Sequence, residues 1–104
     1  MAKYRVYVSE PAEEDLRDIV RYISSQLSAP MTALKMMETI DVALSKLADM
    51  PQAYPLVRDD RLASMGYRRI NVKNYAAFFT INETAKVVDV ERILYARRDW
   101  AQII

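Results

Sequence analysis

Histidine and cysteine are both absent from this chain of 104 residues. Without cysteine the chain has no disulfide framework, no thiol nucleophile and no zinc–thiolate site. Without histidine it lacks imidazole metal ligands and the side chain best matched to proton transfer near neutral pH. Any acid–base chemistry must therefore use tyrosine, lysine, arginine or carboxylates, and we expect neither a metal site nor a cofactor.

Long hydrophobic runs are also missing, since no stretch approaches the roughly 18 apolar residues of a membrane span. The first residues alternate between polar and apolar and lack the apolar core of a signal peptide. The chain has one glycine, four prolines and a hydrophobic share of 52%, a composition that argues against disorder and provides for a core. We expect a soluble cytoplasmic protein whose residues 1–104 form a single domain.

Charge of one sign is not in large excess, because the formal net charge is only +1. Residues 1–53 carry six Lys/Arg against eight Asp/Glu, and residues 54–104 carry nine against six. A dedicated nucleic-acid-binding protein is usually more basic than this. The composition therefore allows nucleic-acid binding without indicating it.

Two periodic patterns fill the first half of the chain. Residues 3–8 alternate and predict a short strand with one buried face. Ser9-Glu10-Pro11 then opens a helix whose apolar residues continue at helical spacing to Leu27. Residues 28–30 interrupt this pattern, and a second helix is predicted from Thr32 to Asp49. Two helices with so short a link form an antiparallel hairpin.

Three strands are predicted in the second half, after a loop over residues 54–64. They span residues 67–73, 75–81 and 86–95, and a bulge near Glu91-Arg92 explains a shift in the apolar phase of the last strand. The fold class is therefore α+β: an N-terminal strand, a helical hairpin and a three-stranded antiparallel meander in one sheet. The first strand must join that sheet at an edge, and the hairpin covers one face while the other stays partly open. The predicted core comprises Leu16, Ile19, Ile23, Ile40, Leu44, Leu47, Val72, Phe79, Val90 and Ile93.

A cluster of charged and aromatic residues, Tyr95 to Trp100, follows the last strand and contains Arg97 and Arg98. Paired arginines at a sheet edge suit a phosphate backbone or an acidic protein partner. The structural alternative is that these arginines pair with Asp99, Asp89 or Glu91. Tyr95 and Trp100 would then be core residues, and Arg92, in the middle of a strand, is interpreted as a paired structural arginine.

The order of elements resembles the RelE/ParE superfamily of bacterial toxins over nearly the whole chain. Three segments carry the resemblance: SEPAEEDLRDIVRYI, YRRINVKNYAAFFTI and VVDVERILYARRDW. The resemblance implies the toxin of a type II toxin–antitoxin (plasmid stabilisation) module, which inhibits growth and is neutralised by a cognate antitoxin in a hetero-oligomer. Its target would be the ribosome with mRNA, as for RelE, or DNA gyrase, as for ParE.

For a ribosome-dependent endoribonuclease, the resemblance implies that Arg69, Arg98 and Tyr95 are catalytic. Arg69 matches one basic position of the strand at residues 67–73, and Arg98, or Arg97 with a one-residue slip, matches the arginine after the last strand. The family arginine of the strand at residues 75–81 falls on Ala76, and no tyrosine follows Trp100 in this sequence. A phenol with an ordinary pKa of about 10 is also a poor acid–base group at neutral pH. The catalytic set is therefore incomplete.

Inhibition of gyrase requires no catalytic set, and the long helical hairpin and low net charge fit this branch, which we favour. In either branch Arg68, Lys73, Arg97 and Trp100 are predicted to bind the antitoxin or the target. A third hypothesis is an inactive domain that keeps the fold and binds only an antitoxin-like peptide. An overexpression growth assay separates this hypothesis from both toxin branches.

Overall fold

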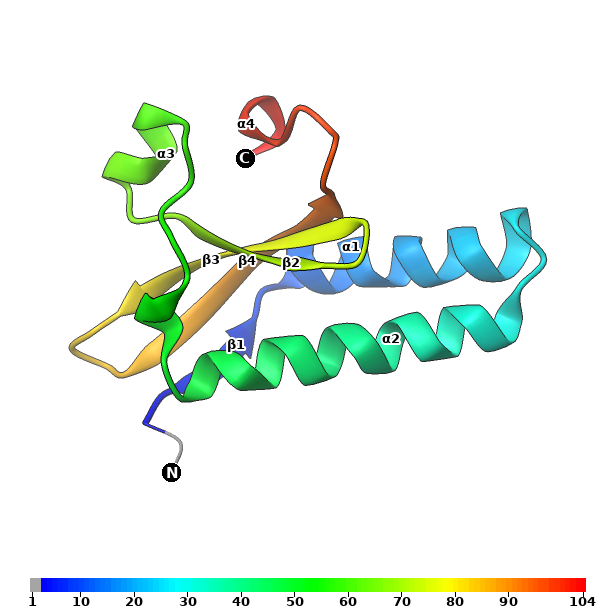
Figure 1. The fold of residues 1–104 in the computed structure, drawn as a ribbon, viewed down its shortest axis with the longest axis horizontal. Coiled ribbons are helices and arrows are strands. Elements are labelled where there is room, and N and C mark those ends of the chain that lie inside the picture. The colour runs from blue at the N-terminus through cyan, green and yellow to red at the C-terminus, as the bar shows by residue number, and fades with distance from the viewer. Residues whose placement is uncertain (1–2) are drawn as a thin grey trace.

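A four-stranded sheet with helices on both faces forms the body of the molecule (Figure 1). The computed structural model describes residues 3–104. The strand order is β1-β4-β3-β2, with β1 parallel to β4 and the other neighbours antiparallel. The predicted fold class and the edge position of the first strand are confirmed. One expectation is wrong: the paired arginines follow β4, which is an interior strand, and therefore do not lie at a sheet edge.

The first strand and helix follow from alternation and capping. Strand β1 spans Arg5–Val8, and helix α1 spans Glu10–Arg21. The Ser9 hydroxyl caps α1 by accepting a hydrogen bond from the amide of Ala12 at 3.2 Å. The helix then continues as a π-helix over Tyr22–Gln26, and the chain turns at Ser28, whose φ is 50°. A π-helix is an uncommon element that often marks functional sites.

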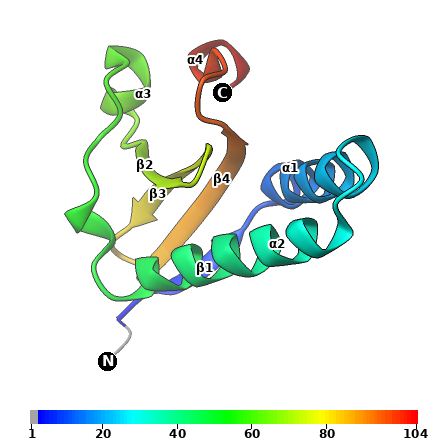
Figure 2. The same cartoon turned by 45° about the vertical axis from the view of Figure 1, so that its right-hand side comes forward.

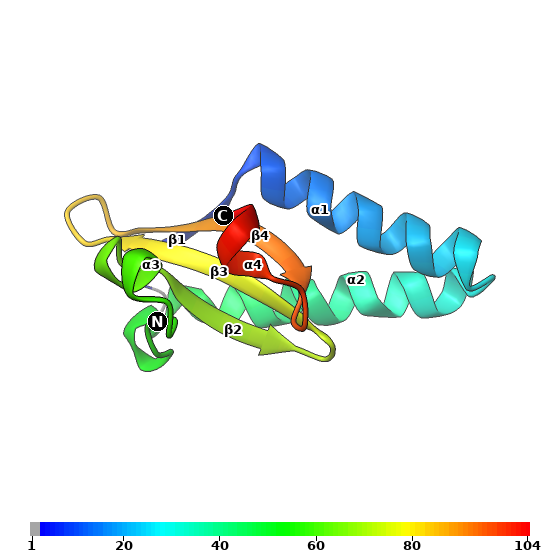
Figure 3. The same cartoon turned by 90° about the horizontal axis from the view of Figure 1, so that it is seen from above.

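Helix α2 spans Pro30–Ser45 and tightens into a 3₁₀ turn, Lys46–Ala48. It begins two residues earlier than predicted because Pro30 suits the first turn, where its missing N–H is not needed. Helices α1 and α2 lie side by side as the expected antiparallel hairpin and extend past the end of the sheet (Figure 3).

The meander comprises β2 (Arg68–Val72), β3 (Tyr75–Asn82) and β4 (Val87–Tyr95). Phe78 pairs with Arg92 and Phe79 with Val90, so Glu91 is an extra residue in β4. The predicted bulge is therefore confirmed. It brings Val88, Val90, Ile93 and Leu94 into buried positions even though their spacing is not a strict alternation.

The hairpin covers one sheet face and encloses the larger core. Ile40 and Leu47 from the α2 segment and Phe79 and Val90 from the sheet are fully buried there. Nine of the ten predicted core residues are buried in this cluster, and Leu16 packs against it half-buried. The core prediction is confirmed.

Two short helices partly cover the other face, which was expected to stay partly open (Figure 2). Helix α3 spans Asp60–Ser64 inside the predicted loop, and helix α4 spans Trp100–Ile103. The Asp59 carboxylate caps α3 at the amide of Leu62, 2.9 Å away. The loop prediction was wrong because so short a helix has no apolar period; only its capping residue indicates it. A second 3₁₀ turn, Pro51–Ala53, precedes this segment.

Candidate functional site

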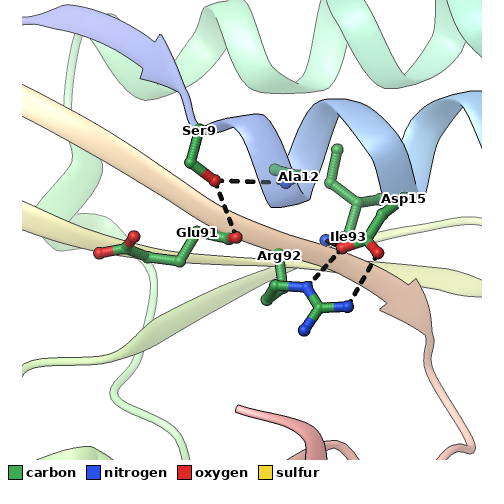
Figure 4. Close-up of polar contacts among 6 residues, drawn as sticks. All are labelled: Ser9, Ala12, Asp15, Glu91, Arg92 and Ile93. Carbon is green, nitrogen blue, oxygen red and sulfur yellow. Dashed lines mark hydrogen bonds and ion pairs between the residues drawn. The ribbon is translucent and has the colours of Figure 1, made fainter.

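A charged clamp fastens the start of α1 to the bulge of β4 (Figure 4). The Asp15 carboxylate accepts two hydrogen bonds from the Arg92 guanidinium, from Nε at 2.7 Å and from a terminal nitrogen at 2.9 Å. The same carboxylate accepts the amide of Ile93 at 3.0 Å, and the Ser9 hydroxyl donates to the Glu91 carbonyl at 2.9 Å. The bulge leaves these backbone groups outside the strand ladder, and the clamp satisfies them.

The clamp is partly shielded from water, with Asp15 and Arg92 side chains 12% and 27% exposed. The hydrogen bonds that Arg92 donates to Asp15 raise the pKa of Arg92, which therefore stays charged. The interpretation of Arg92 as a paired structural arginine is confirmed.

A concave region of about 260 Å³ lies beside the end of β4 and the β2–β3 turn, and we name it the basic hollow. Arg97 shares it with two cations of the β2 segment, and within residues 3–104 none of the three forms an ion pair. The expected alternative, pairing of Arg97 or Arg98 with a nearby acid, is not found in this part of the chain. The polar lining comprises Arg69, Asn71, Lys73, Asn74, Tyr95 and Arg97.

Arg69 is held in place by aromatic rings and by an amide. Its guanidinium carbon lies 5.3 Å from the Phe78 ring centroid and 5.7 Å from that of Trp100. Two of its nitrogens donate to the Asn71 side-chain oxygen at 3.1 and 2.9 Å. Partial burial lowers the pKa of Arg69, although an arginine remains charged at neutral pH. The charge of Arg69 is therefore preorganised beside the basic hollow.

A second concave region, about 520 Å³, lies between α1 and the ends of β3 and β4, and we name it the tyrosine hollow. Ile19 and Ile93 line its apolar part. Burial raises the pKa of Tyr75, and the neighbouring phenols Tyr22 and Tyr95 raise it further. The polar lining comprises Asp15, Asp18, Tyr22, Tyr75, Tyr95 and Arg98.

The structure brings some of the predicted site residues together and separates others. Tyr95 lies at both hollows, but Arg97 shares the basic hollow with Arg69 while Arg98 lines the tyrosine hollow. Trp100 packs on Phe78, with ring centroids 5.0 Å apart, and so belongs to the small core. Arg68 lines neither hollow, since its guanidinium donates to the Tyr54 carbonyl at 2.6 Å.

Sequence reasoning missed the tyrosine hollow as a feature. Tyr22 belongs to the helical periodicity of the first helix, and Tyr75 to the alternation of a strand, so neither suggested a shared site. The π-helix that begins at Tyr22 has no sequence signal that we recognised. The alternation of the strand at residues 67–73 places Arg69, Asn71 and Lys73 on one face, but the contact between Asn71 and Arg69 was not foreseen.

No group of three or more potential ligands among residues 3–104 could hold a metal ion. No helix in the same range is long and apolar enough to cross a membrane.

A family model described as "ParE toxin of type II toxin-antitoxin system, parDE" matches residues 6–100. The chain belongs to the ParE toxin family. This confirms the resemblance to the RelE/ParE superfamily that the sequence indicated. Among curated proteins, the comparison found no match.

Solved structures share the fold of this ParE-family chain. The chromosomal ParDE system of P. aeruginosa aligns with a TM-score of 0.76 at 18% identity, over 91% of this chain and 98% of that one. A mutant of E. coli RelE in the free state gives 0.65 at 17% identity, over 99% and 93%. The RelBE2 toxin–antitoxin complex of Mycobacterium tuberculosis gives 0.63 at 17% identity, over 91% and 93%.

Two positions that the resemblance aligns with basic residues of RelE-like nucleases are packed in the small core: Ala76, aligned with an arginine, and Tyr67, aligned with a lysine of the strand predicted at residues 67–73. Ala76 is fully buried in the small core, where it has neither charge nor access to a substrate. Tyr67 packs against the same core, and its pKa is raised, chiefly by burial and further by Glu91. A phenol with a raised pKa is a weaker acid, and less of it is present at neutral pH as the phenolate that could accept a proton.

Proposed function

We propose that this protein is the growth-inhibiting toxin of a type II toxin–antitoxin module and that it inhibits DNA gyrase, as ParE does. The match of a ParE toxin model to residues 6–100 carries this proposal. The environment of Ala76 supports it, because a buried methyl group stands where the nuclease branch would place an arginine. Inhibition of gyrase by binding needs a surface and no acid–base pair.

Two assays on the purified protein test the choice of target. In the first, gyrase supercoils relaxed plasmid in the presence of increasing toxin; in the second, the toxin is incubated with programmed ribosomes and the mRNA is examined for cleavage. We expect inhibited supercoiling and intact mRNA. Cleaved mRNA with unaffected supercoiling would reverse the assignment.

A nuclease is the second candidate, and one specific observation favours it. Arg69, Lys73 and Arg97 lie with the Tyr95 phenol around one hollow, which could accept a phosphate with its developing negative charge. If the protein cleaves mRNA, Arg97→Ala should abolish cleavage with little effect on folding, because Arg97 is exposed and unpaired among the described residues. Arg98→Ala is the matched comparison and decides between the two neighbouring arginines.

The proposed partner is a cognate antitoxin encoded by an adjacent reading frame. The P. aeruginosa relative is described as a ParDE system and the M. tuberculosis relative as a toxin–antitoxin complex, which supports this pairing. The tyrosine hollow beside the hairpin has an apolar floor and suits a helix that folds on binding. Co-expression with the neighbouring frame should yield a complex that co-purifies; separate elution of the two proteins at low salt would count against the pairing.

A further inference from the structure

The basic hollow is continuous with two neighbouring concave regions, with which it shares lining residues. On one side it adjoins a region of about 510 Å³ that Lys35 and Lys46 of α2 line, and the two share Asn71 and Lys73. On the other side it adjoins a region of about 540 Å³ that Arg58 and Trp100 line, and these share Asn71 and Arg69. The three regions form one continuous path around the β2 edge, which we name the basic track.

Cations along this track outnumber acids by six to one. The cations are Lys35, Lys46, Arg58, Arg69, Lys73 and Arg97, and the one acid is Glu38. Among residues 3–104 none of these six cations is in an ion pair, since the three bridges present join Arg21, Lys86 and Arg92 to their acids. In a chain with a net charge of +1 this is segregation of charge by position. Such a path attracts a polyanion.

We propose that the basic track binds single-stranded nucleic acid, with its phosphates on the lysines and arginines and a base against the exposed ring of Tyr95. The choice of DNA over RNA as the natural strand rests on the proposed action on gyrase. Binding of the strand does not require its cleavage.

Aromatic rings placed among the cations favour a nucleic acid over an acidic peptide. Tyr54, Tyr95 and Trp100 line the same regions, and Tyr95 is 41% exposed. Stacking of bases on such rings, combined with a cationic groove, is the usual mode of binding a single strand. Tyr54 and Trp100 are half-buried and also pack against the two cores, so the exposed Tyr95 ring is the main stacking surface. An acidic peptide would use the charges and leave that ring without a contact.

A hollowed surface also favours a single strand over a duplex. Proteins that recognise duplex DNA insert a protruding helix or β-ribbon into a groove of the duplex. The track instead consists of concave regions beside β2. The short helices α3 and α4 lie over the sheet face opposite the hairpin (Figure 3). A flexible strand can follow such a path around a sheet edge.

Trp100 provides a reporter at the site, because it is the single tryptophan of the chain. Titration with a short oligothymidylate should quench its fluorescence, and anisotropy of the labelled strand should give an affinity that falls with salt. A matched duplex should bind more weakly. Binding of a polyglutamate chain with equal affinity and without quenching would overturn the proposal in favour of an acidic protein segment. Tighter binding of the duplex than of the single strand would overturn the single-strand assignment.

The double variant Lys73→Gln/Arg97→Gln removes two phosphate contacts from exposed positions. Binding should weaken about tenfold or more, and the slope of log affinity against log salt should fall by about 1.4, since each contact contributes about 0.7 for a single strand. The double variant Arg5→Gln/Arg17→Gln has the same net charge but lies outside the track, and it should bind like the parent. Equal weakening in both variants would show that net charge alone is responsible and would refute the track.

The outcome for the track is separable from that for gyrase. If the toxin inhibits gyrase but shows neither quenching nor binding, the track inference fails and the proposed function stands. If the strand binds and supercoiling is unaffected, the track stands and the proposed target fails.

Discussion

The two faces of the sheet differ in the size of the apolar core that each one buries. Under the hairpin, long apolar side chains from α1, α2 and all four strands form a continuous core. On the opposite face a small cluster around Phe78 and Leu62 lies beneath α3 and α4, and cations surround it. Because burial of apolar area supplies most of the folding energy, the hairpin face should carry stability. The other face and the adjoining β2 edge are free to carry charge, and we place binding of the target there.

Truncation of a hairpin-face residue should have the largest effect. Leu44→Ala removes a buried side chain of α2 and should lower the free energy of unfolding by about 2–5 kcal/mol. Leu34→Ala on the same helix is the control, because Leu34 is 51% exposed and should cost little. Urea denaturation of both variants measures the difference. A loss below about 0.5 kcal/mol for Leu44→Ala would mean that α2 does not carry the core.

Loss of the clamp between α1 and β4 should have the second-largest effect on stability. Asp15→Asn leaves the Arg92 guanidinium without its charged partner and should cost about 1.5–3 kcal/mol, in the range for hydrogen bonds to charged groups. Asp18→Asn is the matched control on the same helix, since the Asp18–Arg21 pair is largely exposed and contributes little. Equal stability of the two variants would show that the clamp is dispensable.

Truncation in the small core should lower the free energy of unfolding less than truncation in the large core. Trp100→Ala removes a half-buried ring from the terminal helix and should cost about 1–2 kcal/mol, less than Leu44→Ala despite the larger side chain. The ranking of the two midpoints under identical conditions checks this expectation. A larger loss of stability for Trp100→Ala than for Leu44→Ala would contradict the claim that the hairpin face carries most of the stability.

The smallest effect concerns pH and a polar contact at the far end of the sheet. Hydrogen bonds from Tyr4 and then Gln52, with the nearby Lys86 adding to them, lower the pKa of Glu83 below its ordinary 4.5. A lowered folded-state pKa adds stability above the unfolded-state pKa, and this is lost as pH falls through the folded-state value. The stability difference between the parent and Glu83→Gln should therefore shrink on acidification from neutral pH to below 4.5. A difference that is constant with pH would contradict the assignment.

Most of the fold could be predicted because it depends on periodicity. The alternation of β1, the helical spacing of the hairpin and the phase shift at Glu91 are local patterns that burial enforces. Helix α3 could not be found in this way, because five residues complete too few turns to show a period. The family relation was predictable from the order of elements and is confirmed by the matching family model.

The site was predictable only residue by residue. The sequence identified Arg69, Lys73, Arg97 and Arg98 as candidates, but which arginine shares a hollow with Arg69 depends on the turn after β4. That turn is held by a hydrogen bond from the Arg98 amide to the Tyr95 carbonyl at 3.0 Å and by one from the Ala96 amide to the Asn74 carbonyl of the β2–β3 turn at 2.8 Å, a contact between residues far apart in the sequence. Local patterns contain no information on such a pairing.

Growth inhibition by two charge-matched variants tests the division between the faces most directly. Lys73→Gln/Arg97→Gln and Arg5→Gln/Arg17→Gln would be induced at equal levels, after denaturation has shown that both retain the stability of the parent. We predict that the first loses growth inhibition and that the second arrests growth like the parent. Undiminished arrest by the first variant, or equal loss in both, would contradict the assignment of function to the face opposite the hairpin.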